Sequence, residues 1–133
     1  MATNSAREFH SENKNHKAIT QMIMQLFEHW ELTYEQQAML LSLSTNTHST
    51  IARYKKGIAC LSPSRDIQDR AGHLLAIHKY LRTIFPLNKE LAYAWPTTPN
   101  RHFEGKTPVH VISDEGFLGL IKVRRYLENY IAS

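Results

Sequence analysis

The segment from residue 46 to residue 56 carries the side chains whose types and spacing best suit contact with DNA. It contains three cations and no acidic residue. Asn side chains can read adenine, Arg side chains can read guanine, and Ser and Thr hydroxyls can contact base edges or phosphates. The candidate DNA contacts are Asn46, Thr47, His48, Ser49, Thr50, Arg53, Tyr54, Lys55 and Lys56. The last three of these are expected to anchor phosphates.

Two short helices are predicted to position these side chains as a helix-turn-helix. Thr33 and Gln36 have the spacing of a capping box at the start of the first helix. The capping residues at 44–47 end that helix, and the second one runs from about Asn46 until Gly57 closes it in a left-handed conformation. In such a motif the second helix enters the major groove. An ordinary three-helix unit whose polar face meets water fits the pattern equally well.

The other residues that could do chemistry do not form a catalytic or metal-binding pattern. Eight histidines are scattered along the chain, and the spacing of His73 and His78 makes them diverge on a helix. Cys60 is the single cysteine, and no histidine stands near it in the sequence to activate it. Glycine-rich phosphate loops are absent. The sequence therefore gives no reason to expect an enzyme, a metal site or a cofactor.

Length and composition are those of a small globular protein. The chain has 133 residues, a formal net charge of +4 and 42% hydrophobic residues. This length fits one domain, or two small halves that share a core, and the apolar content excludes wholesale disorder. No apolar run approaches the ~20 residues that a membrane span needs, and the polar N-terminus lacks the pattern of a signal peptide. We therefore expect a cytoplasmic protein with no membrane association.

Helical periodicity and cap signals predict helices and no strand, so the expected fold class is all-α. Residues 1–15 are polar and are expected to form a mobile arm. A helix-turn-helix N-terminal domain is expected over residues 16–63, followed by a small helical domain over residues 64–133. The boundary between them is placed in the connector at residues 58–63.

Cap residues and prolines predict the helices of the second domain. A long helix is expected to begin near Ser64 and to end at Pro86, and Asn88 is expected to cap a short one. Thr107 followed by Pro108 is the signature of another helix start. The last helix of the chain carries a basic and aromatic edge, which fits either a protein interface or the solvated face of an amphipathic helix.

Two strings of residues in the C-terminal half are unusual in composition and spacing. They are Trp95-x-x-Thr98-Pro99-Asn100-x-x-Phe103-x-Gly105-Lys106-Thr107-Pro108 and Gly116-x-x-Gly119-Leu120-x-x-Val123-x-x-Tyr126-Leu127. With them, the chain from about residue 67 onward resembles the toxin-binding domain of Xre/MbcA/ParS-type antitoxins. The N-terminal half resembles the Xre-like helix-turn-helix domain of the same family through Ser49-x-Ile51-Ala52-Arg53-Tyr54-x-Lys56-Gly57.

The resemblance implies an antitoxin of a bacterial type II toxin–antitoxin system. Its partner is expected to be a RES-domain toxin that consumes NAD or transfers ADP-ribose, with the C-terminal helix and tail covering the toxin active site. The residues implied in toxin binding are Arg124, Arg125, Tyr126, Asn129, Tyr130 and Ser133. The family also implies repression of its own operon through operator DNA, often as a homodimer. The alternative is a stand-alone helix-turn-helix transcriptional regulator whose C-terminal domain serves dimerisation.

Overall fold

The computed structural model describes residues 2–43 and 48–133, with side chains described from residue 15 onward, and every regular element in these ranges is a helix. The expected all-α class is therefore confirmed. The helices are α1 (Ala2–His29), α2 (Tyr34–Leu40), α3 (His48–Lys56), α4 (Arg65–Ile84), α5 (Lys89–Ala94), α6 (Pro108–Glu115) and α7 (Phe117–Ala132), with short 3-10 turns η1 (Trp95–Thr97) and η2 (Arg101–Phe103).

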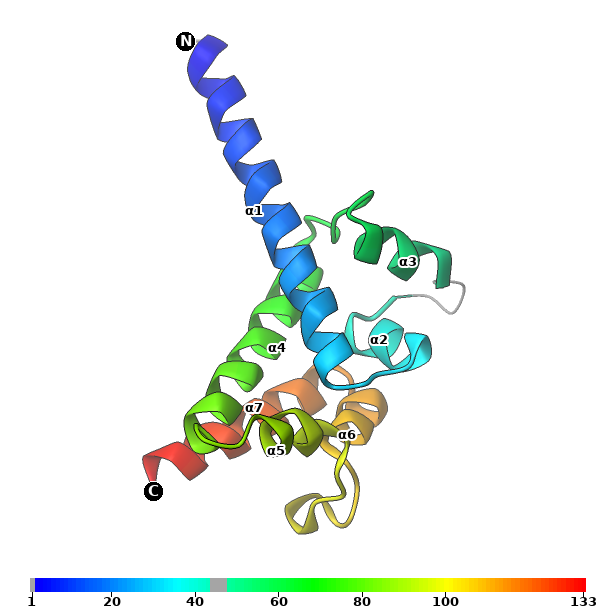
Figure 1. Ribbon diagram of the computed structural model, residues 1–133, viewed down its shortest axis with the longest axis vertical. Coiled ribbons are helices and arrows are strands. Elements are labelled where there is room, and N and C mark those ends of the chain that lie inside the picture. Colours follow the sequence, from blue (N-terminus) through cyan, green and yellow to red (C-terminus); the bar gives the residue numbers. More distant parts are fainter. Residues whose placement is uncertain (1, 44–47) are drawn as a thin grey trace.

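The first helix is longer than the sequence predicts. We expected an arm over residues 1–15, but α1 begins at Ala2 and projects well beyond the body of the molecule (Figure 1). The sequence of α1 contains neither glycine nor proline, so no helix-breaking residue interrupts its polar N-terminal part. Further along, α1 buries Ile23, Leu26 and Phe27 in the core. These buried side chains hold the second part of α1 against the core.

The cap residues start their helices as predicted. The hydroxyl oxygen of Thr33 accepts from the backbone N–H of Gln36, and the Gln36 side chain accepts from the backbone N–H of Thr33 at 2.9 Å. Ser64, Asn88 and Thr107 each accept a backbone N–H at the first turn of α4, α5 and α6, respectively. These local bonds fix where the chain enters each helix.

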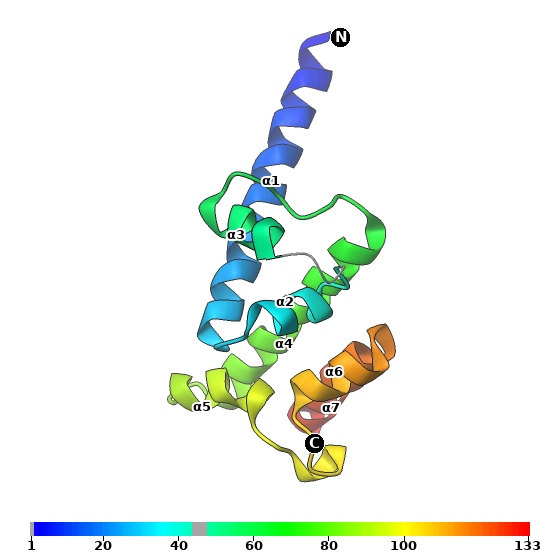
Figure 2. The same ribbon diagram turned by 90° about the vertical axis from the view of Figure 1, so that its right-hand side faces the viewer.

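One hydrophobic core runs through both halves of the chain. Helix α1 packs across α4, α4 packs along α7, and α2 packs on α6, so the two halves meet through several helix pairs (Figures 1 and 2). The largest fully buried side chains come from both halves, among them Phe27, Trp30, Leu40, Leu74 and Leu120. The connector at residues 58–63 therefore divides the sequence, but it does not divide the core.

The segment between α5 and α6 forms a packed corner. Trp95 stacks on Tyr126 of α7 with ring centroids 6.1 Å apart, and Phe103 is buried beside it. After this corner, α6 and α7 approach closely at Gly119, where a Cβ atom would lie 2.5 Å from the carbonyl oxygen of Val111. The described helices include none that is long and apolar enough to cross a bilayer.

Candidate functional sites on α3 and α7

Helix α3 presents one stripe of side chains to solvent. Ile51 and Tyr54 face the core, at 0% and 6% exposure. The helical period places Ser49, Arg53 and Lys56 on the opposite side, and all three are exposed. We call these three residues the outer stripe of α3. It contains two of the three predicted cations and offers hydroxyl and guanidinium groups to a ligand.

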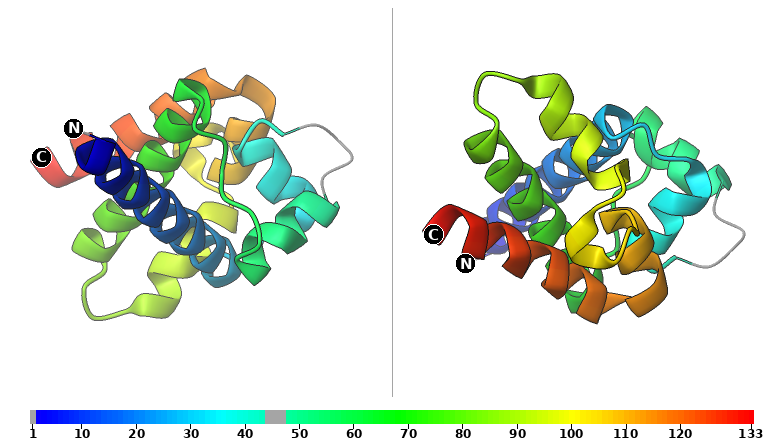
Figure 3. Two further views of the ribbon diagram at one scale, coloured as in Figure 1. Left: turned by 90° about the horizontal axis from the view of Figure 1, so that it is seen from above. Right: turned by 90° about the horizontal axis from the view of Figure 1, so that it is seen from below.

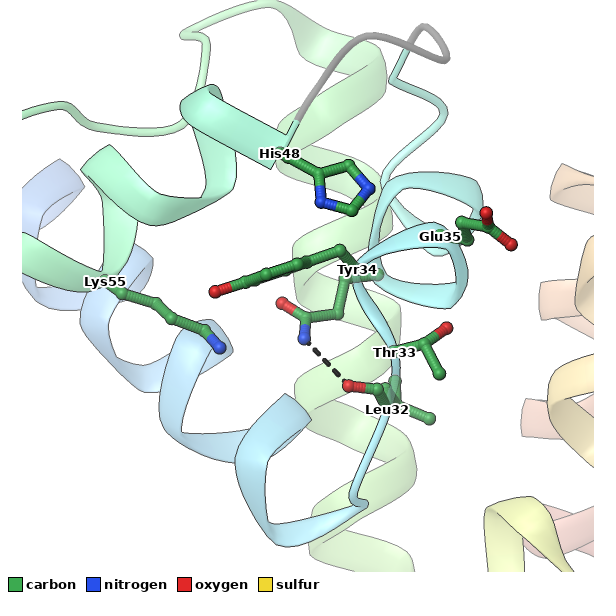
Figure 4. A pocket seen from close by; sticks show the side chains of 7 residues that line it. Leu32, Thr33, Tyr34, Glu35, His48 and Lys55 are labelled. Atoms are coloured by element: carbon green, nitrogen blue, oxygen red, sulfur yellow. Dashed lines mark hydrogen bonds between the residues drawn. The ribbon is translucent and has the colours of Figure 1, made fainter.

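A second pair of candidate residues on α3 faces α2. The Lys55 ammonium lies 4.6 Å from the centroid of the Tyr34 ring, and the His48 ring meets the same tyrosine edge-on at 5.0 Å. These three residues border an open recess of about 520 Å³ (Figure 4). At its floor the Gln37 side chain donates a hydrogen bond to the carbonyl oxygen of Leu32 at 3.0 Å. Lys55 and His48 therefore lie beside the outer stripe, against α2.

The structure does not bring every predicted DNA contact to this surface. Tyr54 belongs to the core, and burial, followed by the nearby Cys60, raises the pKa of its phenol. Its burial in the core does not fit the phosphate-anchoring role expected for it. Thr50 is half-buried. Asn46 and Thr47 lie outside the described residues.

Helix α1 adds two residues that the sequence analysis missed. The Gln21 side chain donates a hydrogen bond to the backbone carbonyl of Tyr54 at 2.8 Å. A Cβ atom placed at Gly57 would lie 3.8 Å from Cε of Lys17, so Lys17 reaches the end of α3. Gly57 has a φ of +74°, the left-handed cap that was predicted. Only the tertiary contact between α1 and α3 reveals that Lys17 belongs to this surface.

The candidate toxin contacts on α7 divide into packed and exposed residues. Arg124 is packed: its Nε donates to Glu128 at 2.8 Å, its Nη1 donates to Nδ1 of His73 at 2.8 Å, and its guanidinium lies over the Tyr80 ring. The bond to Glu128 raises the pKa of Arg124. Since arginine can only donate, Nδ1 of His73 accepts and carries no proton. The contacts with His73 and Tyr80 join α7 to α4, whereas the bond to Glu128 lies within α7.

Tyr126 is the second packed residue among these candidates. Besides stacking on Trp95, its ring lies 4.4 Å from that of His102 and 5.4 Å from that of Phe103. Tyr126 thus holds the corner between α5 and α6 against α7. Arg124 and Tyr126 are therefore half-buried and packed against residues of other elements.

The other four candidates lie exposed at the end of α7. They are Arg125, Asn129, Tyr130 and Ser133, which we call the α7 tip. Tyr130 is 57% exposed and borders a small cavity of about 70 Å³ between the ends of α4 and α7. The tip and α3 lie on opposite sides of the molecule (Figures 1 and 3).

Comparison with known proteins finds a family similarity in the C-terminal part of the chain. Residues 75–130 match the antitoxin Xre/MbcA/ParS C-terminal toxin-binding domain. The matched segment contains the second half of α4, the packed corner and all of the α7 tip except Ser133, whereas His73, the α4 partner of Arg124, lies just before it. The toxin-binding domain match therefore supports an antitoxin role and implies a toxin as partner.

A curated relative extends the similarity beyond that domain. The uncharacterized protein y4oB of Sinorhizobium fredii (strain NBRC 101917 / NGR234) is 27% identical over 118 residues, which cover 89% of this chain and 88% of the relative. This length reaches from the toxin-binding domain into the N-terminal half. The two chains are therefore similar across most of their lengths.

Proposed function

We propose that this protein is the antitoxin of a bacterial type II toxin–antitoxin system and that it neutralises a RES-domain toxin. The observation that carries the proposal is the match of residues 75–130 to an antitoxin toxin-binding domain. In this role the end of α7 covers the active site of a toxin that consumes NAD or transfers ADP-ribose. Covering an active site requires no catalytic group and no cofactor, so the protein acts as an inhibitor and not as an enzyme.

The α7 tip supplies the side chains for this contact. Arg and Tyr are enriched among the residues that dominate protein interfaces, and the tip offers Arg125 and Tyr130 beside the amide of Asn129. Arg124 and Tyr126 fix the direction in which α7 leaves the body, because both are held by residues of other elements. The six residues implied by the resemblance thus divide into four contacts and two positioning residues.

The N-terminal half is proposed to repress the operon that encodes the pair. Its support is the outer stripe of α3, which exposes Ser49, Arg53 and Lys56. A homodimer would place two copies of α3 about 34–36 Å apart, so that each enters a half-site of one operator. DNA binding therefore predicts a palindromic operator upstream of the gene.

The toxin-binding proposal is tested by co-expressing the chain with its RES-domain toxin and measuring cellular NAD. The double variant Asn129→Ala, Tyr130→Ala is expected to lose protection, whereas Leu118→Ala, at the other end of α7 and 73% exposed, is expected to keep it. Deletion of residues 126–133 is a poorer test because it also removes Leu127 from the core. Full NAD protection by the double variant would show that the tip is not the inhibitory element.

The second candidate function is a stand-alone transcriptional regulator whose C-terminal domain only dimerises. The exposed basic stripe of α3 favours it as much as it favours an autoregulating antitoxin. Size-exclusion chromatography of the chain with the co-expressed toxin distinguishes the two. A stoichiometric complex supports the antitoxin, and separate elution of a DNA-binding homodimer supports the regulator.

A further inference from the structure

Helix α3 is flanked by cations that come from two different helices. On the α2 side, Lys55 lies over the Tyr34 ring at 4.6 Å. On the α1 side, Lys17 reaches the Gly57 turn, next to the point where Gln21 bonds to the backbone of α3. The outer stripe, with Arg53, runs between these two flanks. The cations are therefore spread over both sides of α3 as well as its outer face.

We propose that Lys17 and Lys55 contact phosphates on opposite strands of a DNA duplex when the outer stripe of α3 lies in the major groove. The inference rests on the proposed DNA binding by α3. An α-helix with its side chains is about 10–12 Å across and the groove is about 12 Å wide, so the helix fills the groove. Groups on its two flanks then meet the two phosphate backbones. Helix α1 thereby becomes part of the DNA interface.

The exposure and the surroundings of Lys17 suit a phosphate contact. It is exposed, and within the described part of the chain it forms no ion pair with a carboxylate. Gly57 places no side chain between Lys17 and the end of α3. Gln21, one helical turn further along α1, ties this part of α1 to α3 by a hydrogen bond of 2.8 Å. The backbone that carries Lys17 therefore keeps a fixed position relative to the outer stripe.

A purely structural role for Lys17 predicts a different result. A cation near the C-terminal turn of a helix stabilises that helix through its dipole. In that case Lys17→Gln would lower the melting temperature and leave the salt dependence of DNA binding unchanged. A phosphate contact has the opposite signature, because each contact releases counterions from the duplex.

The test is fluorescence anisotropy of the full-length chain with a mixed-sequence B-DNA duplex over a series of KCl concentrations. The variants are Lys17→Gln, Lys55→Gln and the double variant, with Lys17→Arg as the charge-retaining control. Lys79→Gln on α4 is the matched control, because Lys79 is an exposed lysine far along the chain from α3. Each phosphate contact contributes about 0.9 to the slope of log K against log[KCl].

The single variants are expected to lose about 0.9 of that slope and the double variant about 1.8, whereas Lys17→Arg and Lys79→Gln retain the wild-type slope. If the wild type binds and Arg53→Ala weakens it, but Lys17→Gln keeps the full slope, the assignment of Lys17 is overturned while DNA binding by α3 stands. If the wild type shows no salt-dependent binding to the duplex, the proposed DNA function itself fails, and this inference fails with it.

Discussion

The cations of α3 and those around α7 look alike in the sequence but differ in their partners. Around α7, Lys122 lies 2.6 Å from Glu115 and Arg124 lies 2.8 Å from Glu128. On α3, by contrast, Arg53, Lys55 and Lys56 form no ion pair with any carboxylate in the described residues. The same residue types are neutralised locally in one region and left available to an external anion in the other.

This difference predicts two modes of recognition in one small protein. Unpaired cations retain their attraction for phosphates, and that attraction depends strongly on salt. The α7 tip, whose neighbouring cations are paired, offers instead a half-exposed tyrosine, an amide and Arg125, which forms no ion pair in the part of the chain that the structure describes. We therefore expect DNA binding to weaken steeply with salt and toxin binding to depend on it far less. The predictions below test this contrast from the largest effect to the smallest.

The largest effect is expected from Leu127→Ala, which tests whether α7 is a core element as well as a binding element. Leu127 is 1% exposed, and its loss leaves a cavity that costs about 2–5 kcal/mol in the free energy of unfolding. Leu118→Ala on the exposed side of α7 is expected to change stability by less than about 0.5 kcal/mol. Urea denaturation followed by circular dichroism measures both. Equal effects of the two variants would contradict the described packing of α7.

The next prediction compares two arginines, one expected to act in DNA binding and the other in stability. Arg53→Ala is expected to weaken operator binding by about 1–3 kcal/mol and to leave stability unchanged, because Arg53 is exposed and unpaired in the described residues. Arg124→Ala is expected to lower stability by about 1 kcal/mol, since it breaks bonds to His73 and Glu128, and to leave DNA affinity unchanged. Anisotropy titration and thermal melting of both variants separate the two outcomes. A loss of DNA affinity in Arg124→Ala would contradict the assignment of DNA binding to α3 and not to α7.

Much of the fold follows from local signals in the sequence. The helices that begin at Thr33, Ser64 and Thr107 were predicted because a cap needs only residues within one turn to form its bonds. The end of α3 at Gly57 was predicted for the same reason, since the left-handed conformation that ends the helix depends only on the residues of that turn. The start of α1 was not predicted, because its polar first half has no apolar period from which a helix could be inferred.

The division of the candidate residues into packed and exposed ones could not be derived from the sequence. The proposal that Arg124 is a positioning residue rests on its contact with His73, which lies on α4 and is distant along the chain. The surface position of Lys17 likewise depends on how α1 crosses the end of α3. Residue type and helical period proposed the candidates on α3 and α7, but tertiary contacts decide which of these candidates are packed and which are exposed.

The pH dependence of stability is expected to arise from two histidines of α4, of which His73 faces α7 and His78 faces α1 and α5. Burial, followed by the Arg124 charge, lowers the pKa of His73 below its ordinary value of 6.5, although Asp69 and Glu128 oppose this shift. Burial, Arg82 and His29 likewise lower the pKa of His78. Both histidines fold in the neutral form, so their contribution to stability is complete above pH 6.5 and is lost as the pH falls through their lower folded-state pKa values.

The variant His73→Gln isolates one of these groups. An amide oxygen can accept the Arg124 bond without titrating, so the variant is expected to lose less stability than the wild type between about pH 7.5 and about pH 5.5. Urea denaturation at the two pH values measures the difference. The outer stripe of α3 contains no histidine, so DNA affinity should not share this His73-dependent change. An unchanged pH dependence in His73→Gln would remove the Arg124–His73 bond from the account of α7.

The smallest effect is expected where a paired lysine is compared with an unpaired one. The Lys122–Glu115 pair is largely exposed, with side-chain exposures of 60% and 40%, so Lys122→Ala is expected to cost at most about 0.5 kcal/mol in stability. Lys56→Ala is expected to change stability as little, yet to reduce the salt slope of DNA binding by about 0.9. The two variants remove the same charge, in one case from a lysine of α7 that pairs with Glu115 and in the other from a lysine of the outer stripe of α3 that forms no ion pair in the described residues. If Lys122→Ala reduced the salt slope equally, net charge rather than the unpaired surface of α3 would govern DNA binding.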